Sequence, residues 1–271
     1  MTIREQIMAS NRIVIKVGTS SLAYSNGKLN LRQIEKLCQV ITDLSNRGKE
    51  IVLITSGAIG AGIGRLGLND KPKKLEMKQA TAAIGQAYLM QIYQRFFAKY
   101  SQLCAQMLLT KEIVDNHLKR ENVVRTFEEL FKIGVIPIVN ENDSVSTDEI
   151  IGDVFSDNDN LSSVVAVINK ADLLIILSNI DGVYKKVNGN LSNNVINNVD
   201  IITEEIYGYV SNEKSSLGTG GMSSKLNAVK YAMDNSVDSI ICNSKDLNII
   251  YDCLEGKIVG TFFKAGKEDE N

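Results

Sequence analysis

The chain has one histidine, His117, and four cysteines, none of them in a Cys-x-x-Cys pair. A structural zinc site needs several closely spaced cysteine or histidine ligands, so this composition argues against zinc. Ser-His-Asp or Cys-His catalysis would depend entirely on His117. Because His117 stands in a charged stretch with Lys119 and Arg120, it is expected at a solvated helix position. The scattered cysteines are interpreted as reduced thiols, most of them buried.

Long apolar runs and a strong charge bias are also missing. No apolar stretch approaches the roughly 20 residues that span a bilayer, and the first eleven residues lack the apolar core of a signal sequence. With 30 basic and 32 acidic residues the formal charge is −2, which gives no reason to expect nucleic acid or a membrane surface as a partner. We therefore expect a cytoplasmic protein.

Three common nucleotide-binding signatures are absent or misplaced. There is no Walker-type G-x-x-x-x-G-K-[ST] sequence, and the His-Arg-Asp and Asp-Phe-Gly motifs of protein kinases are missing. The run from Gly62 to Gly67 satisfies G-x-G-x-x-G. However, it begins several residues after the preceding strand, and no acidic residue lies between Glu76 and Glu112. A dinucleotide-binding fold is therefore rejected.

What the chain does have is a regular alternation of short β-branched runs and helical patterns. Strands are expected at 12–17, 51–54, 104–109, 135–139, 173–177, 239–242 and 258–262. Helices are expected at 31–47, 73–100, 119–131, 161–169, 222–235 and 247–254. This alternation predicts an α/β three-layer sandwich, in which a mainly parallel central sheet carries helices on both faces. Pro137, which lacks an N–H, is expected at an edge, a strand start or a bulge.

Chemically distinctive residues follow the predicted strands. They are Lys16 and Gly18, Ser56 and Gly57, the run Asn140-Glu141-Asn142-Asp143, and Ser178 and Asn179. Because the carboxyl ends of parallel strands meet at one edge of a sheet, where ligands bind in such folds, these residues are expected to share a site.

Each of these features also has a plainer structural interpretation. Lys16 could extend its ammonium group to solvent at a strand edge, and the glycines after the second strand could serve close packing of a helix on a strand. Asp157 or Asp159 could cap the helix that follows, and Asp181 could belong to a simple turn.

The glycine-rich run from Gly218 to Lys225 precedes a predicted helix. Glycines let backbone N–H groups converge on an anion, and the helix adds the positive end of its dipole. Lys225, one turn into that helix, adds a full charge. This combination suits the phosphates of a nucleotide, although a surface loop before a helix is an equally simple interpretation of the run taken alone.

Taken in order, five blocks resemble the amino-acid kinase family over almost the whole chain, from Arg12 to Phe263. They are Lys16-Val-Gly-Thr-Ser, Ser56-Gly-Ala-Ile, Pro137-Ile-Val-Asn-Glu-Asn-Asp143, Asp157-Asn-Asp-Asn-Leu-Ser162 and Gly218-Thr-Gly-Gly-Met-Ser-Ser-Lys225. Within the family, the third and fifth blocks are similar to the branch that phosphorylates glutamate. The resemblance implies transfer of the ATP γ-phosphoryl group, with Mg²⁺, to the side-chain carboxylate of L-glutamate. This reaction gives L-glutamyl 5-phosphate in the first step of proline biosynthesis.

The resemblance also implies roles for individual residues. Lys16 and Lys225 would flank the transferring phosphoryl group, and Asp159 would orient both lysines. Ser56, Gly57, Asp143 and Asn158 match the glutamate contacts. The nucleotide contacts match Lys16, Gly18, Ser178, Asn179, Thr219, Gly220, Gly221, Met222, Ser223, Ser224 and Lys225. Where the family commonly has Thr-Asp, this chain has Ser178-Asn179; no metal ligand is identified.

Further expectations also come from the resemblance. Residues 1–263 would form one kinase domain, 264–271 would be a frayed charged tail, and the RNA-binding-like domain of many relatives would be missing. A homo-oligomer, feedback inhibition by L-proline and a reductase that accepts the acyl phosphate are implied as partners. Two alternatives stay open: a kinase of this fold that acts on another small acid, and a non-catalytic nucleotide-sensing domain.

Overall fold

The protein is described by a computed structural model, which covers residues 3–24, 28–110, 112–145, 158–187, 190–210 and 221–266. Its main sheet has the strand order β3-β4-β2-β1-β5-β9-β10-β8 within these residues. The strands are β1 Arg12–Val17, β2 Glu50–Ile54, β3 Cys104–Leu109, β4 Ile136–Glu141, β5 Leu173–Ser178, β8 Asn198–Val199, β9 Asp238–Asn243 and β10 Thr261–Phe263. Neighbouring strands are parallel except for β9 and β10. A separate antiparallel hairpin joins β6 (Tyr184–Val187) to β7 (Asn190–Val195).

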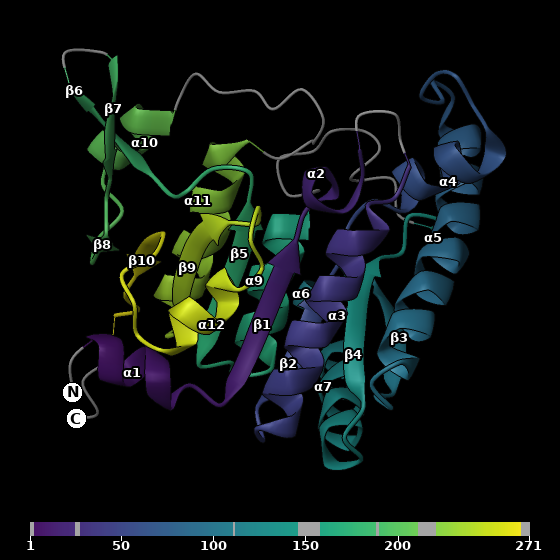
Figure 1. Cartoon of the computed structure of the whole chain (residues 1–271), viewed down its shortest axis with the longest axis horizontal. Helices are drawn as coiled ribbons and strands as arrows, with labels where there is room; N and C mark the ends of the chain where they lie inside the picture. The colour runs from purple at the N-terminus through teal and green to yellow at the C-terminus, as the bar shows by residue number, and fades with distance from the viewer. Residues whose placement is uncertain are drawn as a thin grey trace.

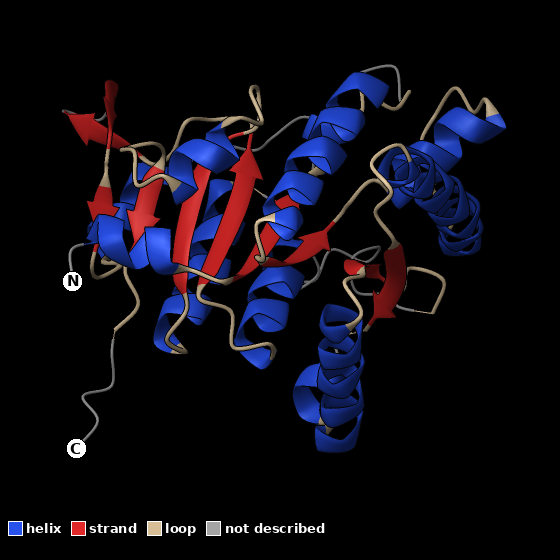
Figure 2. Ribbon diagram, turned by 60° about the horizontal axis from the view of Figure 1, so that its bottom comes forward, coloured by secondary structure: helices blue, strands red, loops and turns tan. Residues whose placement is uncertain are grey.

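Helices pack on both faces of the sheet, as Figures 1 and 2 show. They are α1 Ile3–Ala9, α2 Thr19–Leu22, α3 Leu31–Asn46, α4 Ala58–Leu66, α5 Leu75–Ala98, α6 Glu112–Asp115, α7 His117–Lys132, α9 Asn158–Ile168, α10 Glu204–Val210, α11 Met222–Asp234 and α12 Ile249–Leu254. One apolar core lies between the sheet and α3, α5 and α12, and a second lies between the sheet and α7, α9 and α11. The predicted three-layer α/β sandwich is therefore confirmed. Within the described part of the chain, no helix is both long enough and apolar enough to cross a membrane.

The central strand β1 shows how the sequence divides between the two cores. Ile13 and Ile15 belong to the core on the α3 side, and Val14 belongs to the core on the α9 side. Since side chains alternate along a strand, Lys16 lies on the same face as Val14, toward α9. The order of residues in β1 thus directs one ammonium group to a defined face of the sheet.

The glycine pattern that mimics a dinucleotide fingerprint lies in a helix, α4, and its C-cap Gly67, a helix that the sequence patterns do not predict. A Cβ at Gly62 would lie 2.0 Å from the carbonyl oxygen of Thr81, so only glycine allows the close contact between α4 and α5. The packing partner is therefore a helix, not a strand as expected. This geometry agrees with the rejection of a dinucleotide-binding fold, because the glycines are not at a strand-to-helix turn.

Pro137 lies near the start of β4, between two neighbouring strands. It faces Ala105 of β3, whereas pairing with β2 begins one residue later, at Ile138. The strand-start alternative is therefore confirmed and the edge alternative is not, because the missing N–H falls where the ladder with β2 has not yet formed.

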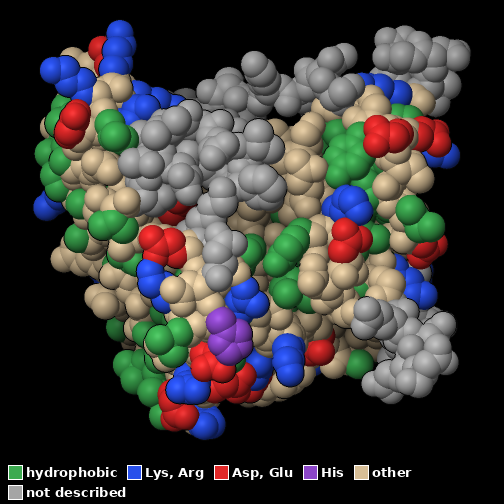
Figure 3. All heavy atoms as spheres, turned by 180° about the vertical axis from the view of Figure 1, so that it is seen from behind, with side chains coloured by type: hydrophobic (Ala, Val, Ile, Leu, Met, Phe, Trp, Pro, Cys, Tyr) green, Lys and Arg blue, Asp and Glu red, His purple; other side chains and the backbone are tan. Residues whose placement is uncertain are grey.

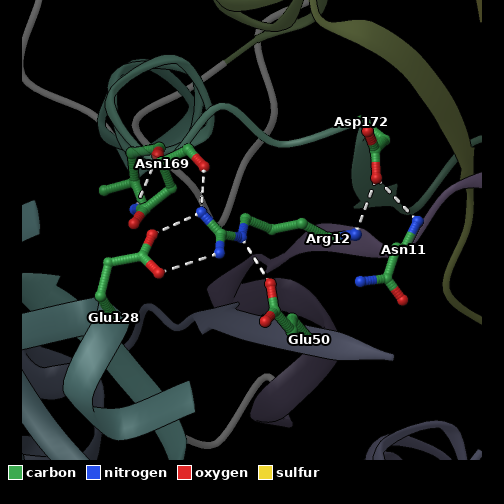
Figure 4. Close-up of polar contacts among 7 residues, drawn as sticks. Asn11, Arg12, Glu50, Glu128, Asn169 and Asp172 are labelled. Atoms are coloured by element: carbon green, nitrogen blue, oxygen red, sulfur yellow. Dashed lines mark hydrogen bonds and ion pairs between the residues drawn. The ribbon is translucent and has the colours of Figure 1, made fainter. Parts of the chain in front are cut away.

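A cluster of hydrogen-bonded side chains around Arg12 links the amino ends of the strands to α7 and the end of α9 (Figure 4). Its guanidinium donates to the carboxylates of Glu50 and Glu128, each at 2.7 Å, and to the carbonyl oxygen of Asn169 at 2.8 Å. Asp172 accepts from the backbone N–H of Arg12 at 2.8 Å. Burial opposes the charge, but the two glutamates outweigh it and raise the pKa of Arg12. One side chain therefore connects β1, β2, α7 and the end of α9.

The histidine, the cysteines and the chain end can be compared with their expected positions. His117 begins α7 with a side chain 82% exposed, and it is the purple side chain on the surface in Figure 3. This confirms the solvated helix position. Cys38, Cys242 and Cys253 are buried free thiols, and Cys104 is half-buried.

The tail is held over its first two residues, because the N–H groups of Lys264 and Ala265 donate to Val199 and Asp238; residues 267–271 lie outside the described part.

Candidate active site

Two lysines and one aspartate meet at the carboxyl edge of the sheet. Lys16 Nζ lies 2.6 Å from Asp159 Oδ1, and Lys225 Nζ lies 3.0 Å from Asp159 Oδ2. All three side chains are buried, with exposed fractions of 6%, 1% and 9% for Lys16, Asp159 and Lys225. The structure thus brings together residues that are far apart in the sequence, and each oxygen of one carboxylate pairs with a different ammonium group.

Three elements determine this arrangement. Lys16 is near the end of β1, Asp159 is in the first turn of α9, and Lys225 is in the first turn of α11. Helices α9 and α11 pack against each other, and both contribute buried apolar residues to the core on this face of the sheet. The packing of α11 on α9 brings Lys225 to Asp159, and the packing of α9 on β1 brings Lys16 to the same carboxylate.

The electrostatics of the trio favour an anionic ligand. Complete burial disfavours the carboxylate of Asp159, but Lys16 and Lys225 outweigh burial and lower the pKa of Asp159 below its usual range. Asp159 is therefore ionised at neutral pH, and the trio holds two positive charges against one negative charge. Buried charges are stable only when they are paired, so the excess of positive charge suits a ligand that brings negative charge.

The plainer interpretations of Lys16 and Asp159 do not describe these contacts. The Lys16 side chain is buried and paired, so its ammonium group does not reach out to solvent. Asp159 does lie in the first turn of α9, but its carboxylate oxygens pair with the two lysines. Asp157 lies outside the described residues.

The residues expected to contact glutamate lie at the same edge. Ser56 and Gly57 follow β2, and Asp143 follows β4, which is the neighbour of β2. The N–H of Thr55 donates to the carbonyl oxygen of Val139 at 2.9 Å, so the two loops leave the sheet side by side.

Backbone geometry and burial shape this part of the site. Gly57 precedes α4 with a φ of 95°, a left-handed conformation that favours glycine. Ser56 and Asp143 are each 6% exposed, and Asn158, the first residue of α9, is 4% exposed. Within the described part of the chain, the side-chain oxygen of Asn158 is buried without a hydrogen-bond partner.

The residues expected to contact a nucleotide lie beside the trio as far as the structure describes them. Ser178 ends β5, Asn179 follows it, and Gly221 immediately precedes α11 in an extended conformation with no side chain capping the helix. Met222, Ser223 and Ser224 form the first turn of α11 together with Lys225. A Cβ at Gly18 would lie 3.5 Å from Lys16 Nζ, so Gly18 borders the ammonium group. Thr219 and Gly220 lie outside the described residues.

Asp181 does more than form a turn. Its carboxylate accepts from Tyr184 Oη at 2.6 Å and from Asn243 Nδ2 at 2.7 Å, and these hydrogen bonds lower the pKa of Asp181. Asn243 ends β9, so Asp181 links the segment after β5 to the end of β9. Sequence patterns do not mark Tyr184 or Asn243, because neither lies in a block with a recognisable pattern.

Asn140, near the end of β4, has a buried partner on the α5 side of the sheet, Gln86, which stands in no recognisable motif. Asn140 Nδ2 donates to Gln86 Oε1 at 2.7 Å, and both side chains are buried. A signal was present, because Gln86 lies one helical turn before Leu89 and Met90 on the otherwise apolar face of α5. A buried polar residue on such a face needs a partner.

Comparison with known sequences agrees with this geometry. The family model described as the Amino acid kinase family matches residues 11–243. A protein of Clostridium perfringens named glutamate 5-kinase is 48% identical over 266 residues, covering 97% of this chain and 99% of the relative. Relatives with the same name from Listeria innocua and Enterococcus faecalis are 46% and 45% identical, and the matches cover 98% of this chain in each case and 97% and 100% of the relatives. The sheet, the charged trio and these matches together show that the chain belongs to the amino acid kinase family.

Proposed function

We propose that this chain transfers the γ-phosphoryl group of ATP to the side-chain carboxylate of L-glutamate, giving L-glutamyl 5-phosphate and ADP in the first step of proline biosynthesis. The observation that carries the proposal is the buried trio of Lys16, Asp159 and Lys225 at the carboxyl edge of the sheet. The relatives named glutamate 5-kinase support the substrate, and membership of the family supports the use of ATP.

The chemistry suits a site without a general base. A carboxylate is already nucleophilic at neutral pH, so one of its oxygens forms the new bond to phosphorus as the bond from phosphorus to the ADP oxygen breaks. The difficulty is the approach of two anions and the charge that spreads over the equatorial phosphoryl oxygens. Lys16 and Lys225 stabilise that charge, and Asp159 orients each ammonium group because it pairs with both.

Glutamate is proposed to bind between the loops after β2 and β4. Asp143 pairs with the substrate ammonium, which explains why an acidic residue stands in a site for an amino acid with two carboxylates. Ser56, Gly57 and Asn158 supply the polar contacts around it. The burial of Ser56, Asp143 and Asn158 supports these roles, because buried polar groups at a sheet edge are hydrogen-bonded to a ligand or to each other.

The nucleotide is proposed to bind across the ends of β5 and α11. The N–H groups in the first turn of α11 and the helix dipole favour phosphate, and at the N-cap, Gly221, no side chain caps the helix. Thr219, Gly220 and the residues from Met222 to Lys225 complete this phosphate contact, and Gly18 approaches from β1. Ser178 and Asn179 contact the nucleoside, where Asn179 offers N–H donors in place of the carboxylate that is common in the family.

Magnesium is proposed to arrive with the nucleotide. Among the residues that the structure describes, no three carboxylates, histidines or cysteines are grouped to hold a metal ion. Mg²⁺ commonly binds through substrate phosphates and water with few protein carboxylates, and such an ion would neutralise phosphate charge.

The wider setting of the reaction is proposed from the family resemblance. L-Proline carries an α-carboxylate and a secondary ammonium group beside it, as glutamate carries a primary one, and would compete for the glutamate site as a feedback inhibitor. The acyl phosphate is labile, which favours a reductase that consumes it promptly. A homo-oligomer and a cytoplasmic location, where ATP and glutamate are abundant, complete the proposal.

The test is hydroxamate formation from the purified chain with Mg-ATP, L-glutamate and hydroxylamine. Hydroxylamine traps an acyl phosphate, so we expect a signal that depends on both ATP and glutamate. Release of ADP with another small acid, without a signal from glutamate, would retain the kinase and discard the substrate. Nucleotide binding without turnover of any acid would favour a sensing domain instead.

A further inference from the structure

The buried pair of Gln86 and Asn140 holds a donor that the proposed reaction has not used. The backbone N–H of Glu141 donates to Asn140 Oδ1 at 2.9 Å, and Asn140 Nδ2 donates to Gln86 Oε1 at 2.7 Å. A backbone N–H can only donate, so it determines which atom of the Asn140 amide is oxygen. The Asn140 amide in turn determines the orientation of Gln86, and the remaining group of Gln86 is its NH₂.

That NH₂ group is buried without a protein acceptor. Among the described residues, no hydrogen-bond partner lies within reach of Gln86 Nε2, although the whole residue is only 7% exposed. Leaving a buried donor unsatisfied is costly, so such groups are normally matched by a ligand or an ordered water. The unmatched donor therefore points to a ligand atom.

The position of Gln86 points to the glutamate site. Its neighbour Gly85 packs against the start of α4, since a Cβ there would lie 1.8 Å from the carbonyl oxygen of Ala58. Ala58 directly follows Gly57, and Asn140 stands three residues before Asp143. Gln86 thus contacts the residue that ends the apolar part of β4, and its neighbour Gly85 contacts α4, so Gln86 lies near both loops proposed to bind glutamate.

The two faces of the sheet offer different groups to the substrate. Lys16 lies on the α9 face, with Val14, whereas Asn140 shares its face with Ile138, which packs in the core on the α5 side. When the side-chain carboxylate of glutamate meets the lysines and its ammonium meets Asp143, the α-carboxylate needs a donor on the α5 side. Gln86 is the described side chain that offers a buried donor there.

We propose that Gln86 donates its side-chain NH₂ to the α-carboxylate of the substrate and so selects for a free α-carboxylate. This inference rests on the function proposed above. Asn140 acts as a positioning residue, because it holds the opposite end of the Gln86 amide.

The test compares the binding of L-glutamate with that of its α-amide, in which a neutral amide replaces the α-carboxylate. Gln86→Glu keeps the acceptor for Asn140 but places negative charge where the NH₂ group was. We expect calorimetry to show glutamate binding weakened about 10–100-fold, and α-amide binding weakened much less, because charged hydrogen bonds contribute most. Gln94→Glu, on the exposed side of the same helix, is the matched control and should change both constants less than about twofold.

A second variant covers the case in which Gln86→Glu does not fold. Gln86→Met removes the donor without adding charge and should weaken glutamate about tenfold while the α-amide loses only a few-fold. An equal loss for both ligands would assign Gln86 a purely structural role and overturn the inference, as would no loss. A wild-type chain that forms no glutamate hydroxamate overturns the proposed function and the inference together; an active wild type with an unchanged ratio in the variants overturns the inference alone.

Discussion

The two ends of β1 each carry a cluster of charged side chains, four residues apart in the sequence, and the clusters are built in opposite ways. At the amino end, one guanidinium, that of Arg12, donates to two carboxylates and a carbonyl oxygen. At the carboxyl end, one carboxylate, that of Asp159, lies between two ammonium groups. The first cluster has more acceptors than cations, and the second has more cations than acceptors. The first therefore holds strands together, and the second is suited to bind a further anion.

Burial strengthens this contrast. The side chains of Glu50 and Glu128 are 33% and 40% exposed, so water solvates them even when they are paired. The side chain of Asp159 is 1% exposed, so its interactions with both lysines act in a medium of low polarity. Arginine suits the first task because its planar fork engages several acceptors, and lysine suits the second because its compact charge can meet a phosphoryl oxygen. Changes at the amino end of β1 should mainly alter stability, and changes at the carboxyl end should mainly alter turnover.

The largest effect should come from removing either lysine of the trio. Lys16→Ala and Lys225→Ala each remove a preorganised positive charge, so we expect kcat to fall by about two to three orders of magnitude. Hydroxamate formation measures this directly. Lys230→Ala is a matched control, because Lys230 lies on α11 and pairs with Asp234 on the surface. An unchanged kcat in either variant would remove that lysine from the catalytic role.

The next largest effect should come from Asp143, which is proposed to bind glutamate and is not part of the charged trio. Asp143→Asn removes the charge that meets the substrate ammonium, so the KM for glutamate should rise about tenfold or more while the KM for ATP changes little. Both constants come from initial rates with one substrate saturating. Equal increases in both constants would contradict the proposed pairing.

At the amino end, Arg12→Ala should alter stability and leave chemistry intact. The variant loses hydrogen bonds to two carboxylates that water can partly solvate, so we expect a loss of about 1–3 kcal/mol in the free energy of unfolding and less than a twofold change in kcat. Urea unfolding measures the first and the hydroxamate assay the second. Arg125→Ala, which removes an exposed pair with Glu121, should cost under about 0.5 kcal/mol. A large fall in kcat for Arg12→Ala would contradict the assignment of stability to the amino-end cluster and turnover to the carboxyl-end cluster.

The smallest effect is a dependence of stability on pH. The lysines lower the pKa of Asp159, so its ionised form stabilises the folded state above the unfolded value of about 3.9. That contribution is lost as the pH falls from this value through the lower folded pKa. The difference in the free energy of unfolding between wild type and Asp159→Asn should therefore narrow below about pH 4. A difference that stays constant from pH 7 to pH 3 would contradict this account.

Local patterns predicted the regular elements well and the glycine-rich ones poorly. The strand at 104–109 was predicted with its observed ends. The helix predicted at 31–47 starts where Asn30 caps it and ends one residue earlier, at Asn46. Helix α4 was missed because its glycines are poor helix formers; it packs closely against α5, which helps to stabilise it. The short strand β8 and the hairpin of β6 and β7 were also missed, since their sequences are polar.

The candidate site divides in the same way. The resemblance to the amino acid kinase family implied that Lys16, Asp159 and Lys225 act together, whereas Gln86 and Asn243 stand in no motif. Their relevance depends on which buried groups they face, and that is decided by helix packing and not by spacing.

By itself the sequence determined the class of fold, because alternating β-branched and helical segments can bury their apolar faces only as a sheet between helix layers. It also determined which chemical groups follow each strand. Only the tertiary structure decided that a single carboxylate lies between two lysines at one end of β1, while a single guanidinium lies among carboxylates at the other. The reason is physical: charge pairing acts over a few ångströms, and those distances are determined by the packing of strands and helices that are distant in the sequence.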